Sequence, residues 1–275
     1  MPEPFSPLDR DLISSRLAAG CVLGREVHVF AETGSTNDLA RRAGEAGVAE
    51  GLVFFSETQR AGRGRRGRAW ASPAGCGLWF SALLRPAASR DKWPRLTLLA
   101  VRAVLESLAG VAGVAAEWKW PNDVMMGTHK LAGILVEATP EFVVLGLGVN
   151  VRQRADDFPA DLRDRAVSVE MITGGAIGRE ALAAGILATL DGDYQADWAG
   201  TDFATVREYC VERSSLAIGN FLRVQSGDES VEGRLLGFTA EAHLRIECAG
   251  RERDICEGLC EVAWDGRQEP RIDAN

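Results

Sequence analysis

The feature that most constrains the fold is the run Gly62-Arg63-Gly64-Arg65-Arg66-Gly67-Arg68-Ala69-Trp70. An apolar run precedes it at residues 52–55, and a second apolar run follows it at residues 78–84. Apolar runs of this length are typical of buried strands. The basic run is therefore predicted to be a loop that joins two strands of one sheet. A loop this long inside a compact domain is usually either functional or disordered.

The composition of this loop favours binding of an anion. Its glycines let backbone N–H groups approach a ligand closely, and successive N–H groups can form an anion-binding concavity. With Arg60, the stretch carries five arginines within nine residues, and their forked guanidinium groups match carboxylates and phosphates. A solvated basic loop and a non-specific nucleic-acid patch are the alternative interpretations of this stretch alone.

The composition of the whole chain is that of a globular protein. It has 275 residues, of which 46% are hydrophobic and 25% charged, and a formal net charge of −8. One basic loop in an acidic chain favours a local anion site over a general polyanion-binding surface. No apolar stretch reaches membrane-spanning length, and no signal-peptide pattern opens the chain. We therefore expect a cytoplasmic protein with no membrane association.

The cysteines and histidines do not predict a metal centre. The six cysteines form no C-x-x-C pair, so we expect free thiols in a reducing compartment and assign no metal ligand. The three histidines, His28, His129 and His243, are scattered along the chain. They give no support to a hydrolase built on a histidine base.

Hydrophobic periodicity and turn residues predict two regions, residues 1–213 and 214–275, with a boundary at Ser214-Ser215. In the first we expect helices at residues 8–17, 91–109, 180–198 and 203–210, and strands at residues 27–30, 52–55, 78–84, 131–137 and 142–147. The 91–109 helix should end at Gly110, and Ser35 or Thr36 should cap another helix. The second region should form a small β-barrel from strands at residues 221–224, 231–238, 243–247 and 253–262.

Four polar residues, Lys119, Asp123, Lys130 and Asn150, fall at predicted strand ends or turns. Any one of them alone would be interpreted as a solvated surface residue. Together, beside a loop of glycine and arginine, they favour a common site.

Several motifs together carry a family resemblance. They are, in chain order, Ser35-Thr36-Asn37, Gln59, Ala61 to Arg68, Lys119-Trp120-Pro121-Asn122-Asp123, Lys130 to Glu137, and Gly146 to Asn150. In this order they resemble the motifs of biotin protein ligases, from about residue 25 to the end of the chain. The resemblance implies an α+β fold, with a mixed β-sheet and helices related to the class II aminoacyl-tRNA synthetase core. It also implies that the C-terminal barrel is SH3-like.

The resemblance implies an enzyme that uses biotin, ATP and Mg²⁺. The carboxylate of biotin attacks the α-phosphate of ATP and forms biotinyl-5′-AMP, and a lysine of a biotin carboxyl carrier protein then takes the biotinyl group. The residues implied in catalysis are Lys130, Arg63 and Asp123. Those implied in binding biotin are Ser35, Thr36, Asn37, Gln59, Arg63, Gly64, Arg65, Lys130 and Gly133. Those implied in binding ATP are Arg65, Arg68, Trp70, Lys119, Asn122, Lys130 and Asn150.

Two alternatives and one departure accompany this resemblance. A lipoate or octanoate ligase would share the fold, but its motifs lack the Gly/Arg run, and a nucleic-acid-binding protein could use the same basic loop. Some biotin protein ligases carry an N-terminal DNA-binding domain, whereas about 25 residues precede the first predicted strand here. We therefore expect no specific DNA binding. The sequence leaves the oligomeric state open, a homodimer included.

Overall fold

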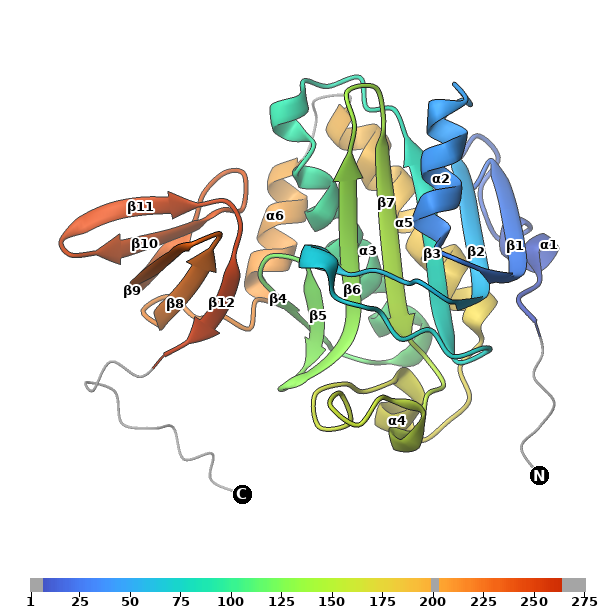
Figure 1. The fold of residues 1–275 in the computed structure, drawn as a ribbon. Coiled ribbons are helices and arrows are strands. Elements are labelled where there is room, and N and C mark those ends of the chain that lie inside the picture. The colour runs from blue at the N-terminus through green and yellow to red at the C-terminus, as the bar shows by residue number, and fades with distance from the viewer. Residues whose placement is uncertain (1–6, 199–202, 264–275) are drawn as a thin grey trace.

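The computed structural model describes residues 7–198 and 203–263. Its largest element is a seven-stranded sheet in the order β1-β2-β3-β7-β6-β5-β4 (Figure 1). The strands are β1 Glu26–Thr33, β2 Leu52–Gln59, β3 Gly77–Leu84, β4 Glu117–Lys119, β5 Asp123–Met126, β6 His129–Ala138 and β7 Val143–Asn150. β1 pairs with β2 in parallel, and the remaining pairs are antiparallel. The predicted mixed sheet with helices is thus confirmed.

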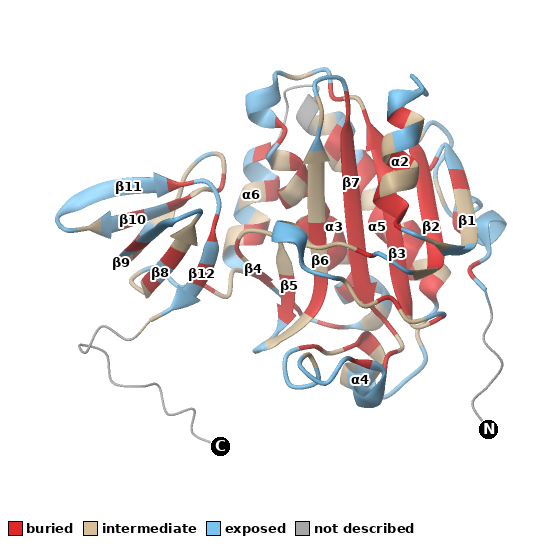
Figure 2. Cartoon of the chain, in the orientation of Figure 1, coloured by how far each residue is buried: buried red, intermediate tan, exposed pale blue. Residues whose placement is uncertain are grey.

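Helices cover both faces of this sheet (Figure 1). The α-helices are α1 Arg10–Ser14, α2 Thr36–Glu45, α3 Arg95–Ala112, α4 Val169–Thr173, α5 Arg179–Trp198 and α6 Phe203–Glu212. Short 3₁₀ turns are η1 Arg65–Gly67, η2 Arg90–Lys92 and η3 Ala155–Asp157. α2 packs on β2 and β3 from one side, whereas α3 and α5 pack together on the other. The central strands β3 and β7 are consequently buried along their whole length (Figure 2).

Several boundaries differ from the sequence predictions. The first helix covers only Arg10–Ser14, where Asp9 caps it by accepting hydrogen bonds from two backbone N–H groups. The next long helix begins at Arg95, after Pro94, and passes through Gly110. It ends at Gly113, whose φ of 65° is the left-handed conformation that favours glycine. The strand predicted at residues 253–262 is two strands, because the chain leaves the sheet between Ile255 and Leu259.

The C-terminal strands form a second, five-stranded antiparallel sheet. These strands are β8 Phe221–Ser226, β9 Glu229–Phe238, β10 Leu244–Cys248, β11 Arg251–Ile255 and β12 Leu259–Val262, in the order β11-β10-β9-β8-β12. Trp118 packs on Phe238 with ring centroids 5.3 Å apart, and Trp120 Nε1 donates to the Ala242 carbonyl at 3.1 Å. These contacts fix the small sheet against the end of the large one.

A buried ion pair joins the large sheet to α5. The Arg179 Nη1 lies 2.7 Å from Glu57 Oε2, and the two side chains are 1% and 3% exposed. Glu57 also accepts the backbone N–H of Leu8, and Arg179 donates to the Gly77 carbonyl at 3.3 Å. Four distant segments therefore meet at one charge pair.

Two further sequence predictions concern the cysteines and the membrane. All six cysteines are free thiols, as predicted. Among the described residues, none of the helices combines the length and the apolarity that crossing a lipid bilayer requires.

Candidate active site

One cleft of about 630 Å³ gathers every residue that the sequence assigned to ligand binding or catalysis. Its walls come from the start of α2, the Gly/Arg loop, the strand ends from β4 to β7, and the last strand of the small sheet. Segments as distant as Ser35 and Glu261 thus share one lining. A volume of this size is typical of a small-molecule site.

One end of the cleft is a network of neutral polar groups. Gln59 Oε1 accepts hydrogen bonds from the backbone N–H and the Oγ1 of Thr36, at 2.9 and 3.2 Å. The Ser81 Oγ lies 2.7 Å from Thr36 Oγ1 and 2.5 Å from Asn37 Oδ1. Ser35 is the residue that precedes α2, but its side chain makes no capping hydrogen bond. Capping therefore does not explain the Ser35 hydroxyl, which lines the cleft.

A charged cluster lies beside this network. The Arg63 guanidinium forms a forked pair with Asp38, at 2.6 and 3.1 Å, and holds the pKa of the Asp38 carboxyl below its usual range. Glu137 accepts a hydrogen bond from Asn37 Nδ2 at 2.6 Å and lies 3.8 Å from Arg63. The Arg63 guanidinium, predicted to act on the ligand, is thus already paired with the Asp38 carboxylate. This pair connects the Gly/Arg loop to α2.

Three residues of these two groups, Ser81, Asp38 and Glu137, have no role in the sequence-based assignment. Asp38 was interpreted only as an acidic residue in the first turn of a helix. Glu137 ends the Lys130–Glu137 motif, which was the one available signal for it. Nothing in the local sequence around Ser81 distinguishes it from the rest of a buried strand.

Two glycines make a flat floor for the tryptophan of the basic loop. Gly133 and Gly148 are partners across β6 and β7. A Cβ on Gly148 would lie 2.6 Å from the Trp70 ring, and one on Gly133 would lie 3.0 Å from it. Trp70 also meets Trp79 edge-on at 6.1 Å. Trp70 Nε1 is buried without a hydrogen-bond partner within the described ranges.

Lys130 and Asp123 form an ion pair in the lining of the cleft. Lys130 Nζ lies 2.6 Å from Asp123 Oδ1 and 5.2 Å from the centroid of the Trp70 ring. Asp123 is opposite Gly133 in the antiparallel register of β5 and β6, and the Lys130 side chain reaches the same point, since a Cβ on Gly133 would lie 3.0 Å from Lys130 Nζ. The side chains of Lys130 and Asp123 are 32% and 28% exposed. A cation and a proton acceptor are therefore available at the same point.

Two predicted nucleotide contacts, Asn122 and Asn150, also hold the backbone in place. Asn122 Nδ2 donates to the Ile134 carbonyl at 2.6 Å, and Asn122 Oδ1 accepts from Arg65 at 3.2 Å. Asn150 is 5% exposed, and its Nδ2 donates to the carbonyls of Lys130 and Val167 at 3.3 and 3.2 Å. These amides fix the loop and the strand end on either side of Lys130.

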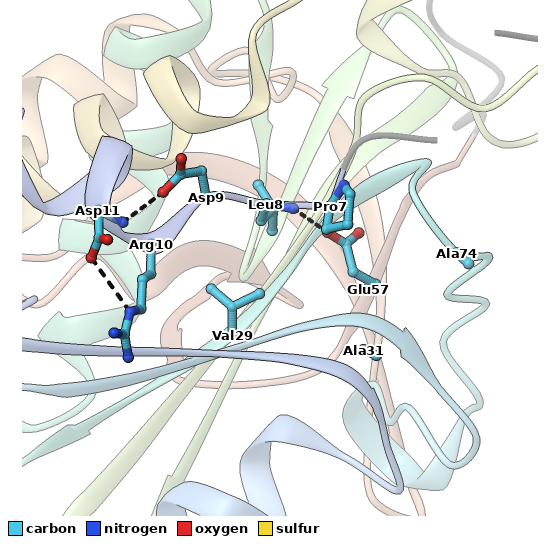
Figure 3. A pocket seen from close by; sticks show the side chains of 9 residues that line it. All are labelled: Pro7, Leu8, Asp9, Arg10, Asp11, Val29, Ala31, Glu57 and Ala74. Atoms are coloured by element: carbon cyan, nitrogen blue, oxygen red, sulfur yellow. Dashed lines mark hydrogen bonds and ion pairs between the residues drawn. The ribbon is translucent and has the colours of Figure 1, made fainter. Parts of the chain in front are cut away.

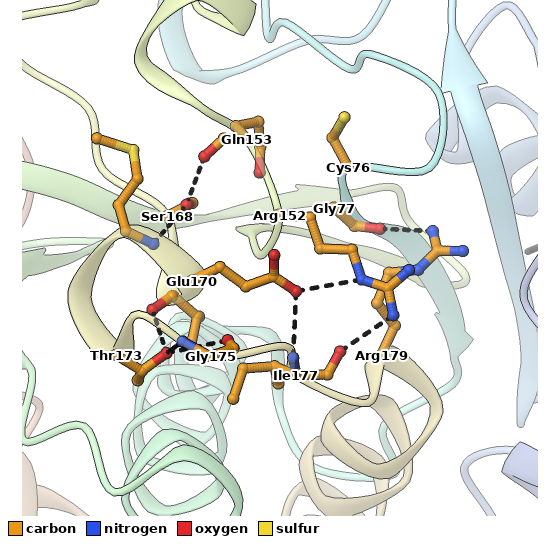
Figure 4. Close-up of polar contacts among 12 residues, drawn as sticks. Cys76, Gly77, Arg152, Gln153, Ser168, Glu170, Thr173, Gly175, Ile177 and Arg179 are labelled. Atoms are coloured by element: carbon orange, nitrogen blue, oxygen red, sulfur yellow. Dashed lines mark hydrogen bonds and ion pairs between the residues drawn. The ribbon is translucent and has the colours of Figure 1, made fainter. Parts of the chain in front are cut away.

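The segment from residue 151 to 178 adds a wall that the sequence did not predict. It contributes Phe158, Leu162, Arg165 and Ala166 to the cleft. Polar contacts anchor its base (Figure 4): Arg152 lies 3.4 Å from Glu170, and Ser168 Oγ donates to the Gln153 carbonyl at 2.7 Å. The wall thus rests on side chains that lie outside the cleft.

The small C-terminal sheet closes another side. The cleft is lined there by Gly258, Leu259, Cys260 and Glu261, none of which was predicted from the sequence as a site residue. Two neighbouring arginines of the loop reach this sheet. Arg65 Nη2 lies 3.4 Å from Glu257 Oε2, and Arg66 donates to the Gln225 carbonyl at 2.9 Å. Arg66 has a φ of 59°, a left-handed conformation that costs a non-glycine residue about 1–2 kcal/mol.

A second hollow lies far from these groups, against α1 (Figure 3). Its polar side chains already have partners. Asp9 accepts the backbone N–H groups of Asp11 and Leu12 at 2.8 and 3.1 Å, and Glu57 pairs with the buried Arg179. These contacts fasten the N-terminal residues to the sheet. They leave the larger cleft as the candidate active site.

Comparison with known proteins identifies similar sequences. A profile of the biotin/lipoate A/B protein ligase family matches residues 29–151. The chain is 35% identical over 258 residues to the biotin–[acetyl-CoA-carboxylase] ligase of Mycobacterium tuberculosis, covering 92% of this chain and 94% of that one. It is 34% identical over 231 residues to the bifunctional ligase/repressor BirA of Bacillus spizizenii, covering 82% and 70%.

The fold is likewise similar to that of a solved ligase. The biotin protein ligase from Aquifex aeolicus, determined in complex with biotin and ATP, superposes with a TM-score of 0.77 at 26% identity. The match covers 87% of this chain and 100% of that one. On these grounds the chain belongs to the biotin protein ligases of the biotin/lipoate A/B protein ligase family.

Proposed function

We propose that this chain is an ATP-dependent ligase that activates biotin as biotinyl-5′-AMP and transfers it to a lysine of a biotin carboxyl carrier protein. The observation that carries the proposal is the cleft, which brings all fifteen residues assigned from the family motifs into one lining. Relatives that are more than 30% identical carry the corresponding ligase names.

In the first step, a carboxylate oxygen of biotin bonds to the α-phosphorus of ATP. The bond to the bridging oxygen breaks, and pyrophosphate leaves with the electron pair. Both reactants are anions, so positioning and preorganised positive charge should do most of the work. Lys130 lines the cleft and can supply such charge, and the backbone N–H groups around Gly64 are proposed to receive the biotin carboxylate.

The neutral network at the other end suits the head group of biotin. A ureido ring presents two N–H donors and one carbonyl acceptor, so its site needs paired acceptors and donors. Thr36, Asn37 and Gln59 carry such groups and are held by Ser81 and by one another. The dithiolane ring of lipoate and the alkyl chain of octanoate would leave these groups unpaired. A buried polar site strongly rejects a ligand that leaves its hydrogen-bonding groups unpaired, so we expect the site to reject lipoate and octanoate.

In the second step, the lysine amine of the carrier protein attacks the carbonyl carbon of biotinyl-5′-AMP. The bond to the phosphate oxygen breaks and AMP leaves. Asp123 is proposed to orient the incoming amine and to take its proton. Asp123 lines the cleft and is about one-quarter exposed, so an amine can reach it.

Magnesium fits this site as a partner of the nucleotide. In the part of the chain that the structure describes, His, Cys, Asp and Glu side chains form no group of three that could hold a metal ion. Mg²⁺ usually keeps several water ligands and binds through substrate phosphates with one or two carboxylates. It would neutralise phosphate charge, and Asn150 is proposed to support it.

We further propose relationships for the two sheets. The seven-stranded part would correspond to the class II aminoacyl-tRNA synthetase core, and the five-stranded sheet to an SH3-like barrel. The barrel would form a separate C-terminal domain from about residue 214. Its direct contribution to the cleft supports a role for it in catalysis.

Pyrophosphate–ATP exchange with biotin, lipoate and octanoate side by side tests the function. We expect exchange with biotin alone, followed by biotinylation of a carrier-protein lysine. Exchange with lipoate and none with biotin would move the chain to the lipoate ligases. Absence of exchange with all three acids would refute an acid-activating role.

A further inference from the structure

The positively charged side chains of the cleft fall into two groups. Three of them have a carboxylate partner: Arg63 with Asp38 at 2.6 Å, Lys130 with Asp123 at 2.6 Å, and Arg65 with Glu257 at 3.4 Å. Their charges are partly neutralised before any ligand binds. Such pairs hold the loop and the strands in position, and they leave less charge for a substrate.

A second group has no carboxylate partner within residues 7–198 and 203–263. It comprises Arg66, Arg68, Lys119 and Arg165, which all line the cleft; Arg66 donates instead to the Gln225 carbonyl at 2.9 Å. Unpaired cations that converge on one cavity repel one another, and an anion that enters relieves this repulsion. The family motifs account for Arg68 and Lys119 as nucleotide contacts. They do not account for Arg165, which lies outside every motif that carried the resemblance.

The backbone of Arg165 is fixed beside Lys130. The Arg165 carbonyl accepts the N–H of Lys130 at 2.7 Å, and the Lys130 carbonyl accepts the N–H of Val167 at 3.0 Å. These two bonds form a short parallel bridge between the 151–178 segment and β6. Asn150 reinforces it by donating to the Val167 carbonyl at 3.2 Å. Arg165 is thus exposed and lines the cleft, and these hydrogen bonds hold its backbone in place.

We propose that Arg165 binds the β- and γ-phosphates of ATP and the pyrophosphate that forms from them. This inference rests on the proposed function. When the α-phosphorus bonds to the biotin carboxylate, the bridging oxygen takes the electron pair and negative charge grows on the leaving pyrophosphate. A guanidinium group suits this charge because its planar fork matches two phosphate oxygens. An acidic surface of the carrier protein is the other anion available, but the location of Arg165 beside Lys130 favours the phosphates.

The test compares Arg165→Ala with Arg163→Ala. Arg163 is in the same segment, pairs with Asp156 at 3.8 Å, donates to the Phe158 carbonyl at 3.3 Å and does not itself line the cleft, so it is a control for changes in the segment. In pyrophosphate–ATP exchange, Arg165→Ala should raise the KM for pyrophosphate by about tenfold and leave the KM for biotin unchanged. Arg165→Lys should recover part of the loss, and Arg163→Ala should match the wild type.

Direct titration of pyrophosphate into the full-length protein gives a second measurement. Arg165→Ala should bind pyrophosphate about tenfold more weakly than the wild type, whereas the affinity for adenosine should not change. An unchanged affinity for pyrophosphate would overturn the proposal. So would normal exchange combined with a raised KM for the carrier protein, because this result assigns Arg165 to protein docking. A wild type that binds pyrophosphate without biotin-dependent exchange would refute only the proposed function.

Discussion

At the scale of single residues, the cleft is organised by charge pairs that form before substrate arrives. The family motifs pointed to Arg63 and Lys130 as cations, and both lie in the cleft. Their carboxylate partners were harder to predict. Asp123 was assigned a role of its own, Asp38 was interpreted only as an acidic residue at a helix start, and Glu137 contacts Asn37 across 100 positions of sequence. Such partners depend on strand register, which the local sequence does not specify.

Lys130→Ala tests the charge of Lys130. The substitution removes the cation that lies 2.6 Å from Asp123 and lines the cleft. We expect the kcat/KM for adenylate formation to fall at least about tenfold, equivalent to about 1.4 kcal/mol of transition-state stabilisation. Lys92→Ala, at an exposed position outside the cleft, should leave adenylation unchanged. Wild-type kinetics for Lys130→Ala would exclude its assigned role.

Arg65→Gly tests retention of the intermediate. Arg65 joins the loop to Asn122 at 3.2 Å and to Glu257 at 3.4 Å, and burial lowers the pKa of its guanidinium. Without these bonds the glycine-rich loop should close less often, because ordering glycine is entropically costly. Biotinyl-5′-AMP should then dissociate faster and label lysines of an unrelated protein such as albumin.

The control for this loop experiment is Arg60→Gly. Arg60 carries the same charge, lies outside the cleft and pairs with Glu32, so retention of the adenylate should not change. Equal dissociation rates for Arg65→Gly and the wild type would show that the contacts of Arg65 do not hold biotinyl-5′-AMP in the cleft.

At the scale of elements, the pair β6–β7 supplies a floor without side chains at Gly133 and Gly148. The sequence predicted both strands, because their apolar runs are long and uninterrupted. It did not show that Trp70 would lie over these glycines, since the contact depends on how the loop folds back. Nor did it distinguish Gly110 from Gly113 as the end of α3, because the preceding residues fit a helix equally well up to either.

Gly148→Ala tests this floor. The added Cβ would lie 2.6 Å from the Trp70 ring, so the ring or the strand must shift. Overpacking of this kind costs about 1–3 kcal/mol, and the loop should be displaced more readily than the central strand. We expect the KM for biotin and for ATP to rise together, measured by pyrophosphate exchange.

The matched control for the floor is Gly110→Ala. Gly110 is exposed within α3, and a Cβ there would meet nothing within 4 Å. This substitution should raise the free energy of unfolding by up to about 1 kcal/mol and leave both KM values unchanged. If Gly148→Ala also left both KM values unchanged, substrate binding would not depend on the packing of Trp70 against Gly148.

At the scale of the whole molecule, distant parts of the chain depend on a few shared contacts. The Glu57–Arg179 pair links β2 to α5 and reaches both Leu8 and Gly77. The general α+β architecture was predictable from the sequence, because strands and helices have different hydrophobic periods. The pairing of residues 57 and 179 was not predictable, since isolated charges usually lie on the surface.

Arg179→Met tests this buried pair. Glu57 would keep its charge in an environment where it is 3% exposed, so we expect the free energy of unfolding to fall by about 3–5 kcal/mol. Arg253→Met is the control, since Arg253 lies 2.8 Å from Glu229 but both are about half exposed. That surface pair should contribute at most about 1 kcal/mol. If urea unfolding showed similar losses of unfolding free energy for the two variants, burial would not make the Glu57–Arg179 pair more important than the surface pair.

The cleft described above draws on residues from Ser35 to Glu261, and this has a consequence for synthesis of the protein. A ribosome releases the N-terminal strands long before it makes β12, so the growing chain holds most of the catalytic groups without their closing wall. A chain that stops before residue 257 lacks the carboxylate that pairs with Arg65. The cleft therefore gains its last wall only after β12 has been synthesised, and we expect only chains that include β12 to retain biotinyl-5′-AMP.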